Sequence, residues 1–291
     1  MKICIECQAT FDAEDWCCPY CGFEPKRAGK WLTFAKDMIE TGPKEFGDDT
    51  YARMSATEEN SFYCHSRLRL LQLAFRRFFP DAKDIYDFGT GTGYVLQGMR
   101  SIKPDLKLYG SDLSVASLAW VDSLLDGDVR LFHTDADHIP YSEHFDVIGA
   151  FDVLEHIEDE QTVLRAFHKA IKPGGGVLVT VPQHMSLWSR LDDETGHQRR
   201  YRGDELAVKV KAAGFSVVLD TCFMGTLFLP QYFSRRWLVS PTGSKGFEPE
   251  HNLPGPLNEI LKGVLGLELM LIKAGIRVPF GGMRIVAAHK L

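Results

Sequence analysis

The 291-residue sequence lacks any uninterrupted apolar run of about 18 residues, which argues against a membrane-spanning helix. It also lacks an excess of positive charge: the net charge is −6, which argues against a broad nucleic-acid-binding surface. The chain opens on cysteines and acidic residues and has no segment typical of a signal peptide. Internal repeats and low-complexity tracts are missing too. We therefore expect a cytoplasmic globular protein with reduced thiols.

Beyond residue 21 the chain is poor in cysteine, yet five of its seven cysteines fall within the first 21 positions. Four of them form two Cys-x-x-Cys pairs with ten residues between the pairs: Cys4, Cys7, Cys18 and Cys21. Two such turns can place four thiolates tetrahedrally around Zn²⁺; a redox pair and an iron site are the alternatives. The spacing predicts a zinc ribbon over residues 1–26. Its metal would be structural, because four thiolates leave no open coordination position.

Strand-like apolar runs alternate with helical stretches from residue 84 onward. The strand-like runs are 84–89, 106–112, 145–152, 176–182, 215–223 and 283–291, and the helical stretches are 93–101, 114–125 and 160–171. This alternation predicts an α/β fold with a doubly wound sheet. Residues 58–79 have helical spacing. Residues 27–57 are interpreted as a linker and helical cover.

Three glycines at alternate positions follow the first strand in "DIYDFGTGTGYVLQGM" (84–99): Gly89, Gly91 and Gly93. Without Cβ atoms the turn can bend sharply and lie against a ligand. The spacing differs from the dinucleotide pattern G-x-G-x-x-G, and an acid, Asp87, stands at the strand end. A carboxylate there would repel a pyrophosphate and attract an ammonium group.

Two further acids follow the next strands. Asp112 lies 19 residues after Gly93, where a carboxylate can accept hydrogen bonds from ribose hydroxyls. Asp135, followed by the small apolar Ala136, can hold an adenine amino group beside an apolar wall. A ligand with an ammonium, a ribose and an adenine but no phosphate is S-adenosylmethionine.

The chain resembles the class I S-adenosylmethionine-dependent methyltransferases over about residues 60–223 and the last strand. The matching segments are "YDFGTGTGY", "GSDLS", "TDADHIPYSEHFDVI", "FDVLEHIED" and "KPGGGVLVTVP". The resemblance implies a Rossmann-like seven-stranded sheet whose last strand is antiparallel, between the fifth and sixth strands. It also implies that 172–176 is a structural turn before the fifth strand. The methyltransferase domain would span 58–291, with a helical insertion at 224–281.

Carried over by position, the resemblance implies a set of cofactor-binding residues. The glycine loop would surround the methionine part, the second strand end would hold the ribose, the third would hold the adenine, and the fourth would line the pocket floor. These residues are Asp87, Gly89, Thr90, Gly91, Gly93, Asp112, Leu113, Asp135, Ala136 and Asp152. Tyr63, His65 and Arg67 would either cover the cofactor or pack an N-terminal helix.

Two histidines are candidates for the base that removes a proton from the methyl acceptor. His156 follows Glu155 after the fourth strand and has a near-neutral ordinary pKa; alternatively, the two residues only orient the following turn. His197 lies in "LDDETGHQRRYRGDEL" (191–206), whose arginines suit phosphate or carboxylate groups or else pair with neighbouring acids. "GHQRRY" looks like an element of methyltransferases in sugar, quinone and surface-glycan pathways.

The sequence therefore predicts methyl transfer from S-adenosylmethionine to a heteroatom, preferably oxygen, of a small-molecule, sugar or lipid-linked acceptor. An RNA methyltransferase that grips RNA with the ribbon is one alternative; the net charge and the missing Pro-Pro-Tyr type motif argue against it. A non-catalytic cofactor-binding interaction protein is another. The leucine-rich insertion, with Arg235, Arg236 and Trp237, favours core packing, a lid or a homodimer face over peripheral membrane contact.

Overall fold

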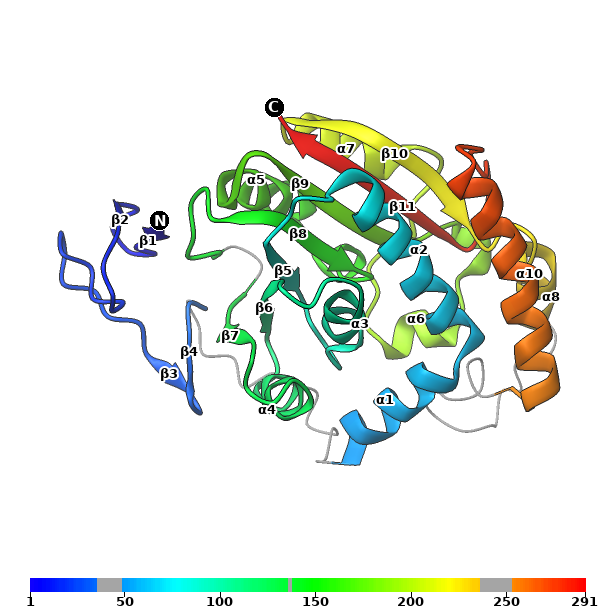
Figure 1. Cartoon of the computed structure of the whole chain (residues 1–291), viewed down its shortest axis with the longest axis horizontal. Helices are drawn as coiled ribbons and strands as arrows, with labels where there is room; N and C mark the ends of the chain where they lie inside the picture. Colours follow the sequence, from blue (N-terminus) through cyan, green and yellow to red (C-terminus); the bar gives the residue numbers. More distant parts are fainter. Residues whose placement is uncertain (36–48, 136–137, 236–252) are drawn as a thin grey trace.

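The computed structural model describes residues 1–35, 49–135, 138–235 and 253–291, and a seven-stranded sheet forms its centre (Figure 1). The strands are β5 (Asp84–Phe88), β6 (Lys107–Asp112), β7 (Arg130–His133), β8 (Phe145–Phe151), β9 (Ile171–Pro182), β10 (Phe215–Phe223) and β11 (Met283–Lys290). Their order across the sheet is β10-β11-β9-β8-β5-β6-β7. β11 is antiparallel to both neighbours, while the pairs among β5 to β9 are parallel. The predicted topology, with the last strand between the fifth and sixth, is confirmed.

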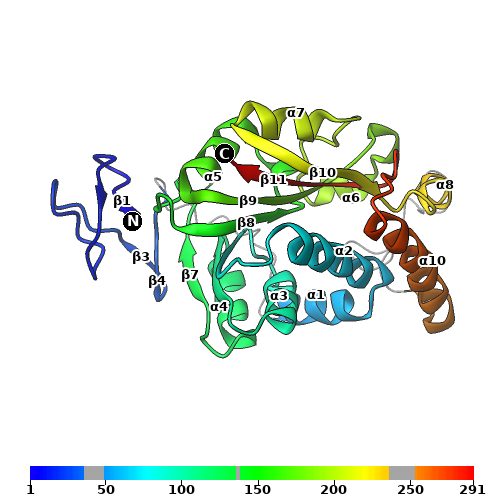
Figure 2. The same cartoon turned by 45° about the horizontal axis from the view of Figure 1, so that its top comes forward.

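Helices cover both faces of this sheet. Figure 2 shows α5 (Glu160–Ala170) and α7 (Glu205–Ala212) on one side and α2 (Phe62–Phe78) and α3 (Tyr94–Ile102) on the other. Adjacent residues of β5 accordingly point to opposite cores, as the pleat of a strand requires. Ile85 packs in a cluster with Leu71 of α2, whereas Tyr86 packs in a second cluster with Phe167 of α5.

The remaining described elements are shorter or lie at the periphery. The helices are α1 (Asp49–Asn60), α4 (Val115–Leu124), α6 (Arg190–Glu194), α8 (Phe228–Phe233) and α10 (Gly255–Lys273), and the 3₁₀ turns are η1 (Leu154–His156) and η2 (Met185–Leu187). Within the predicted insertion, α8 and α10 are described, whereas Arg236 and Trp237 lie outside the described residues. No helix among the described residues is long and apolar enough to span a membrane.

An N-terminal module, residues 1–35, lies beside β7 at one edge of the sheet (Figures 1 and 2). It contains two small antiparallel pairs: β1 (Lys2–Ile3) with β2 (Thr10–Phe11), and β3 (Arg27–Ala28) with β4 (Trp31–Leu32). Thr33 then forms a parallel bridge to His133 of β7. The module therefore covers an edge strand whose backbone groups would otherwise have no neighbouring strand.

The helix expected over 58–79 is two helices, α1 and α2, which break at Ser61. Ser61 has an extended backbone (φ −72°, ψ 126°), and its side chain accepts a hydrogen bond from the Cys64 amide, so it caps α2. The buried Asn258 of α10 accepts a hydrogen bond from the Phe62 amide at 2.8 Å. A capping serine and a distant asparagine together end the continuous helix that the apolar spacing suggests.

Two other expectations differ from the structure. The strand β7 was not among the expected strand-like runs, because its four residues, "RLFH", are too few and too mixed to show a pattern. The glycines expected in a turn at 172–176 lie inside β9. A Cβ on Gly176 would lie 2.1 Å from the Ala288 carbonyl oxygen, and one on Gly175 would lie 2.5 Å from the Asp146 carbonyl oxygen. These glycines permit close strand approach beside a register shift between Phe145 and Val147.

Candidate active site

A cavity of about 680 Å³ opens at the carboxyl ends of the central strands. In open α/β sheets, ligands bind at this edge, and this volume suits a drug-sized ligand. Nine of the predicted cofactor and catalytic residues line it: Asp87, Gly89, Thr90, Gly91, Asp112, Leu113, Asp152, His156 and His197. These nine residues come from the ends of β5, β6 and β8 and from the segment before α7.

The three glycines of the loop serve different purposes. Gly91, with φ of +53°, lines the cavity, and a Cβ placed there would meet no atom within 4 Å. Gly89 (φ +75°) lies so close to Val153 that a Cβ added there would be 2.7 Å from a valine methyl group. Gly93 (φ +74°) is the N-cap of α3 and faces Val121, and it is not part of the cavity lining. Of the three glycines, Gly89 and Gly91 therefore border the cavity.

Asp87 and Asp112 face the cavity from adjacent strands. One oxygen of Asp112 accepts a hydrogen bond from the Gly91 amide at 2.9 Å, and the other accepts one from the Ser114 amide at 2.8 Å. Asp87 is 2% exposed, and its Oδ1 has no hydrogen-bond partner among the described residues. Burial raises the pKa of both carboxyls, for Asp87 well above its usual range. A cationic ligand group beside Asp87 would reverse that shift and satisfy the oxygen.

Asp152 occupies a strained backbone position, with φ of +59°, directly after β8. Its carboxylate accepts hydrogen bonds from Thr180 at 3.1 Å, from Tyr63 at 3.4 Å and from Arg67, with which it also forms an ion pair. Tyr63 and Arg67 line the cavity, so two of the three α2 residues predicted to cover a cofactor reach it, whereas His65 does not line it. The positively charged Arg67 is therefore held at the cavity wall by a fixed acid.

The third strand end is arranged differently from the expectation. Oδ1 of Asp135 lies at hydrogen-bonding distance, 2.6 Å, from Nδ1 of His138. Asp135 is not among the residues that line the cavity, whereas its neighbour Thr134 is. Ala136 lies outside the described residues. The described part of this loop therefore contributes Thr134 to the cavity.

Sequence reasoning missed Glu58 and Tyr51, both from α1. Glu58 lines the cavity, is 9% exposed and accepts a hydrogen bond from Thr92. Burial raises the pKa of Glu58. Tyr51 donates to Ser114 at 2.9 Å. No sequence signal marks these residues, because they lie in a polar stretch and meet the glycine loop only through tertiary packing.

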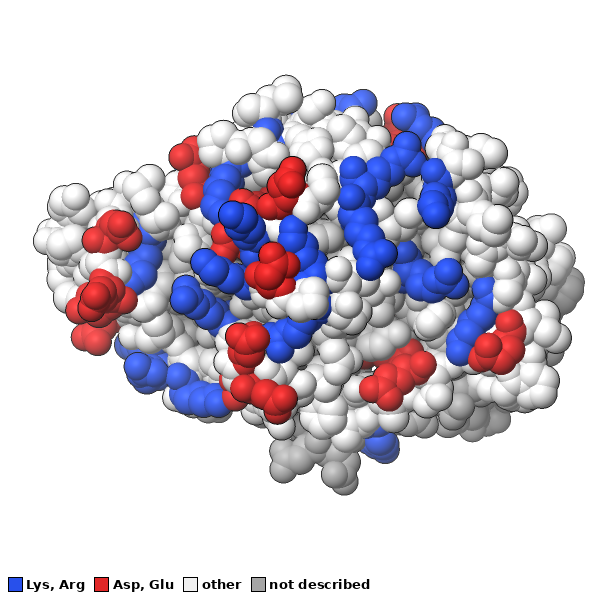
Figure 3. Space-filling view, in the orientation of Figure 1, with Lys and Arg blue, Asp and Glu red and all other residues white. Residues whose placement is uncertain are grey.

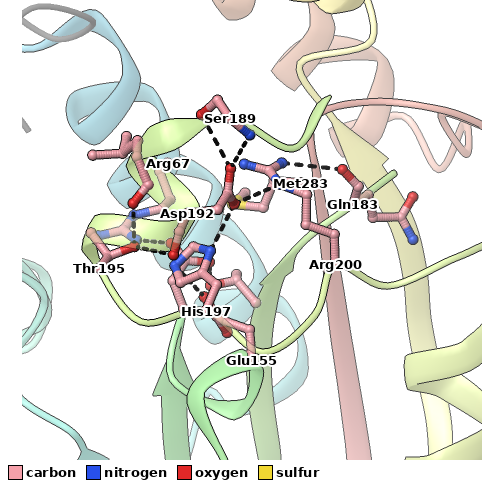
Figure 4. Close-up of polar contacts among 12 residues, drawn as sticks. Arg67, Glu155, Gln183, Ser189, Asp192, Thr195, His197, Arg200 and Met283 are labelled. Atoms are coloured by element: carbon pink, nitrogen blue, oxygen red, sulfur yellow. Dashed lines mark hydrogen bonds and ion pairs between the residues drawn. The ribbon is translucent and has the colours of Figure 1, made fainter. Parts of the chain in front are cut away.

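Asp192 lines the cavity and holds several neighbouring side chains in place (Figure 4). It is 1% exposed and accepts hydrogen bonds from Nδ1 of His197 at 2.8 Å, from Nε of Arg200 at 2.7 Å and from the Ser189 amide at 2.8 Å. Burial alone would favour the neutral acid, but the bonds from His197 and Arg200 hold the pKa of Asp192 well below its usual range. An ionised Asp192 fixes the ring of His197 and keeps a proton on its Nδ1.

Glu155, His156 and His197 form a compact group beside Asp192. Each offers one ligand atom, and these atoms all lie within 4.8 Å of one another. Glu155 is fully buried, neither of its side-chain oxygens accepts a hydrogen bond from another described residue, and burial raises its pKa well above the usual range. Burial and the neighbouring His197 lower the pKa of His156, so that its imidazole is neutral. A proton or a cation could therefore be held between these groups.

The four cysteines of the two pairs cluster in the N-terminal module. Sγ of Cys4 lies 3.6 Å from Sγ of Cys21, and Sγ of Cys7 lies 3.6 Å from Sγ of Cys18. All four sulfur atoms lie within 4.8 Å of one another. Two thiolates on a tetrahedral zinc ion lie about 3.8 Å apart, since the Zn–S distance is about 2.3 Å. The donor set and its spacing therefore fit Zn²⁺.

Comparisons with known proteins agree with this architecture. A family model described as "Methyltransferase domain" matches residues 55–219, more than half of the chain. The ubiquinone biosynthesis O-methyltransferase of Pseudomonas entomophila (strain L48) is 31% identical over 98 residues, which are 33% of this chain and 42% of that protein. That of Stutzerimonas stutzeri (strain A1501) is 34% identical over 100 residues, with the same coverage. The chain thus spans about two-fifths of the length of these curated relatives.

Two solved structures share the fold. Haemonchus contortus phosphoethanolamine N-methyltransferase 2, in complex with phosphomonomethylethanolamine and S-adenosylhomocysteine, has a TM-score of 0.56 and 18% identity; the match covers 85% of this chain and 59% of that one. The second structure is a chain from the complex of the Haloferax volcanii Trm112 methyltransferase activator with a methyltransferase. Its TM-score is 0.55 and its identity 16%, and the match covers 83% of this chain and 94% of that one. With the family match, the strand order and the strand-end cavity all in agreement, this chain belongs to the methyltransferase-domain family.

Proposed function

We propose that this protein transfers a methyl group from S-adenosylmethionine to an oxygen of a small-molecule, sugar or lipid-linked acceptor. The observation that carries the proposal is the juxtaposition, in one cavity, of Asp87 and Asp112 with the Asp192–His197 pair. The first two residues suit the cofactor, and the second two suit removal of a proton from an acceptor hydroxyl. The matches to ubiquinone biosynthesis O-methyltransferases support oxygen as the acceptor atom.

The residues at the cofactor end fit S-adenosylmethionine. The unpartnered Oδ1 of Asp87 can accept a hydrogen bond from the ammonium group, and Gly91 leaves space for the backbone to approach the ligand. Asp112 uses one lone pair of each oxygen for a backbone amide, which leaves a second lone pair on each for the ribose hydroxyls. Leu113, 43% exposed at the cavity edge, provides apolar surface beside the ribose.

The chain's own part in the reaction is to orient the acceptor and take its proton. When bound, the cofactor supplies a methyl group already activated on a sulfonium centre. Because Nδ1 of His197 donates to Asp192, its Nε2 carries the lone pair and can accept the hydroxyl proton as the new carbon–oxygen bond forms. Nε2 lies 3.9 Å from Oε1 of the buried Glu155. The resulting imidazolium would be stabilised by the ionised Asp192, which favours the proton transfer.

A divalent cation at Glu155, His156 and His197 is a second candidate mechanism, and their convergent ligand atoms favour it. Such a cation would lower the pKa of a bound acceptor hydroxyl, and His197 would then be a ligand and not a base. The variant His156→Asn separates the two mechanisms. If His197 acts alone, this variant keeps kcat within a few-fold of wild type and activity survives chelation. If a cation is required, the variant loses most of its activity, and added Mn²⁺ or Mg²⁺ changes the wild-type rate.

A structural zinc ion in the four-cysteine cluster belongs to the same proposal. Replacing Cys4 and Cys7 with serine should release about one zinc per chain, measured by a colorimetric chelator. Protein purified in native form without metal would contradict this assignment.

The charge distribution favours a compact acceptor over RNA. On the face that Figure 3 shows, Lys and Arg gather over α2, where Arg69, Arg76 and Arg77 are exposed. α2 reaches the cavity, however, through Tyr63 and Arg67, so Arg76 and Arg77 lie roughly 15–20 Å away along the helix. Around the cavity, Arg67 and Arg200 are paired with Asp152 and Asp192. Nucleic-acid binding remains an outcome of the experiment below.

The experiment is a labelling survey. Purified protein and methyl-labelled S-adenosylmethionine are added to a host extract that is then separated into soluble metabolites, lipid and glycan material, and RNA. Label in the metabolite or lipid and glycan fractions would support the proposal. Label in RNA would mean that the acceptor is RNA and not a small-molecule, sugar or lipid-linked compound. Cofactor binding without any labelled product would favour a non-catalytic role.

A further inference from the structure

The N-terminal module is attached to both flanks of the loop that follows β7. On one side, the Ile3 amide donates to the Pro140 carbonyl oxygen at 2.9 Å, and the Ser142 amide donates to the Met1 carbonyl oxygen at 3.0 Å. On the other side, the Phe34 amide donates to the His133 carbonyl oxygen at 2.8 Å. These bonds join residues about one hundred or more positions apart, and they add to the pairing of β7 with β6 when the module is docked.

His133 links this attachment to the cavity. It is 2% exposed; its Nδ1 is 2.8 Å from Oγ1 of Thr33, and its Nε2 is 3.1 Å from the carbonyl oxygen of Leu113. A carbonyl can only accept, so Nε2 carries the proton and Thr33 donates to Nδ1. Leu113, which accepts this hydrogen bond, and Thr134, which follows His133 in the chain, both line the cavity. A line of bonds thus runs from the module through His133 to the predicted ribose site.

Trp16 connects the cysteine cluster to the docking contacts, because it packs both on the small core of Cys4, Phe11 and Cys18 and on the main core, which includes Phe34 and Tyr141. Its ring is tilted against that of Phe34, with centroids 4.7 Å apart, and meets Tyr141 edge-on at 5.4 Å. Cys4 directly follows Ile3, whose amide makes the bond to Pro140. A module with so little apolar mass of its own depends on metal for its fold. Loss of the metal would therefore release Ile3 and Trp16, and would remove the contacts that Trp16 makes with Phe34 and Tyr141.

We propose that the N-terminal module is part of the cofactor-binding apparatus: with metal bound, it holds His133 and Leu113 in the arrangement that accepts the cofactor. Thr33 and His133 are positioning residues in this arrangement, since neither belongs to the cavity lining. The inference rests on the proposed cofactor site and adds a metal-dependent control of its affinity. The coupling acts on the ribose end, because Leu113 follows Asp112 directly.

The test measures binding of S-adenosylhomocysteine by calorimetry to the full-length chain and its variants. The Cys4→Ser/Cys7→Ser variant should lose zinc and bind with a Kd raised roughly tenfold, the effect of losing a buried hydrogen-bond network. Thr33→Val should keep zinc and raise the Kd by about threefold, and Thr33→Ser should restore wild-type affinity. Tyr20→Ala, at a module residue that is 71% exposed, is the control and should change neither the zinc content nor the Kd.

Hydrogen exchange separates this coupling from general unfolding. In the zinc-free and Thr33→Val variants, the amides of β7 and of Tyr141 and Ser142 should exchange faster, whereas the amides of β9 should keep their protection. Unchanged Kd values in both variants, with zinc lost from the first, would overturn the inference and leave the proposed function standing. Failure of the wild-type chain to bind the cofactor product would overturn both. If the cysteine variant does not fold, Thr33→Val alone decides.

Discussion

Asp112 shows how a single carboxylate can serve the loop and a ligand at once. Its two oxygens accept hydrogen bonds from the amides of Gly91 and Ser114. These residues belong to the loops that follow β5 and β6 and border the cavity. The same oxygens face the space in which a ribose would lie. In the proposed function, Asp112 therefore both shapes the site and binds the ribose.

Replacing Asp112 with asparagine should reduce cofactor affinity by at least tenfold. The side-chain oxygen of the asparagine can still accept a hydrogen bond from the Ser114 amide. Its NH₂ group would then face the Gly91 amide, which is also a donor, and the side chain would offer the ribose one acceptor atom fewer. Calorimetric titration with S-adenosylhomocysteine measures the effect. The exposed Asp105→Asn is the matched control and should bind as wild type. Equal affinity in the two variants would remove Asp112 from the cofactor site.

Asp192→Asn should lower kcat by about a hundredfold and leave the cofactor Kd nearly unchanged. The amide cannot fix the Nδ1–H tautomer of His197 as a carboxylate does, so Nε2 would not reliably present its lone pair. Asp192→Glu keeps the charge and should recover part of the rate. Because Arg200 loses its partner, thermal unfolding must show that the variant is folded at the assay temperature. A kcat equal to that of wild type would exclude His197 as the base.

The places of Asp87, Asp112 and Asp152 at the cavity could be predicted because each lies at a strand end in the sequence, whereas Asp135, predicted on the same ground, does not line it. The surroundings of His197 could be predicted only in part. His197 lies in a polar segment that sequence reasoning singled out, but Asp192 belongs to the run "LDDE", which is typical of a solvated surface. Its burial depends on Arg200 and Ser189. Glu58 likewise meets Thr92 through a contact between residues 34 positions apart.

At the scale of elements, β9 depends on backbone contacts that side-chain patterns do not reveal. Its apolar half, "GVLVTVP" (176–182), predicts a buried strand, and the structure extends that strand back to Ile171 through Gly174 and Gly175. Gly176, where the two segments meet, pairs with His289 of β11, so the two backbones touch at the end of the expected turn. The split of the 58–79 helix has a similar origin, since Asn258 comes from α10, almost 200 residues away in the chain.

Gly176→Ala should destabilise the fold by about 3 kcal/mol, because the new methyl group would lie 2.1 Å from a backbone oxygen that cannot move independently of β11. Gly263→Ala is the opposing control: the glycine lies in the exposed part of α10, with no atom within 4 Å of the added Cβ. That change should stabilise by up to about 1 kcal/mol, since alanine favours helix. Urea unfolding of both variants measures the difference, and two equal midpoints would contradict the account of β9.

At the scale of the whole molecule, the order of the main strands could be predicted, but the docking of the N-terminal module could not. Alternation of strands and helices limits the possible sheets, and the family resemblance selects one order. The module's contacts with Pro140 and His133 join segments with no complementary pattern in the sequence. The cysteine spacing predicts a metal site, but says nothing about the surface on which that site rests.

The interface beneath this module should make stability sensitive to acid. Burial lowers the pKa of His144 to about 4, with a further contribution from the N-terminal ammonium group. Between about pH 4 and the ordinary value of 6.5, the unfolded chain binds a proton there that the folded chain does not. The free energy of unfolding therefore rises with pH in this window: the contribution of His144 is complete above pH 6.5 and is lost as the pH falls toward 4.

His144→Phe removes this titration and keeps a ring against Tyr141, whose centroid lies 4.4 Å away. The variant's free energy of unfolding should fall less than that of wild type between pH 7 and pH 4.5, as measured by urea denaturation at each pH. Because the substitution also leaves the Tyr109 hydroxyl without the imidazole, Tyr109→Phe is the control, and it should keep the wild-type slope. Asp87 and Glu155, whose raised pKa values give the opposite pH dependence, are present in all three proteins and cancel. Parallel curves for His144→Phe and wild type would mean that this imidazole takes up its proton as readily in the folded chain as in the unfolded one.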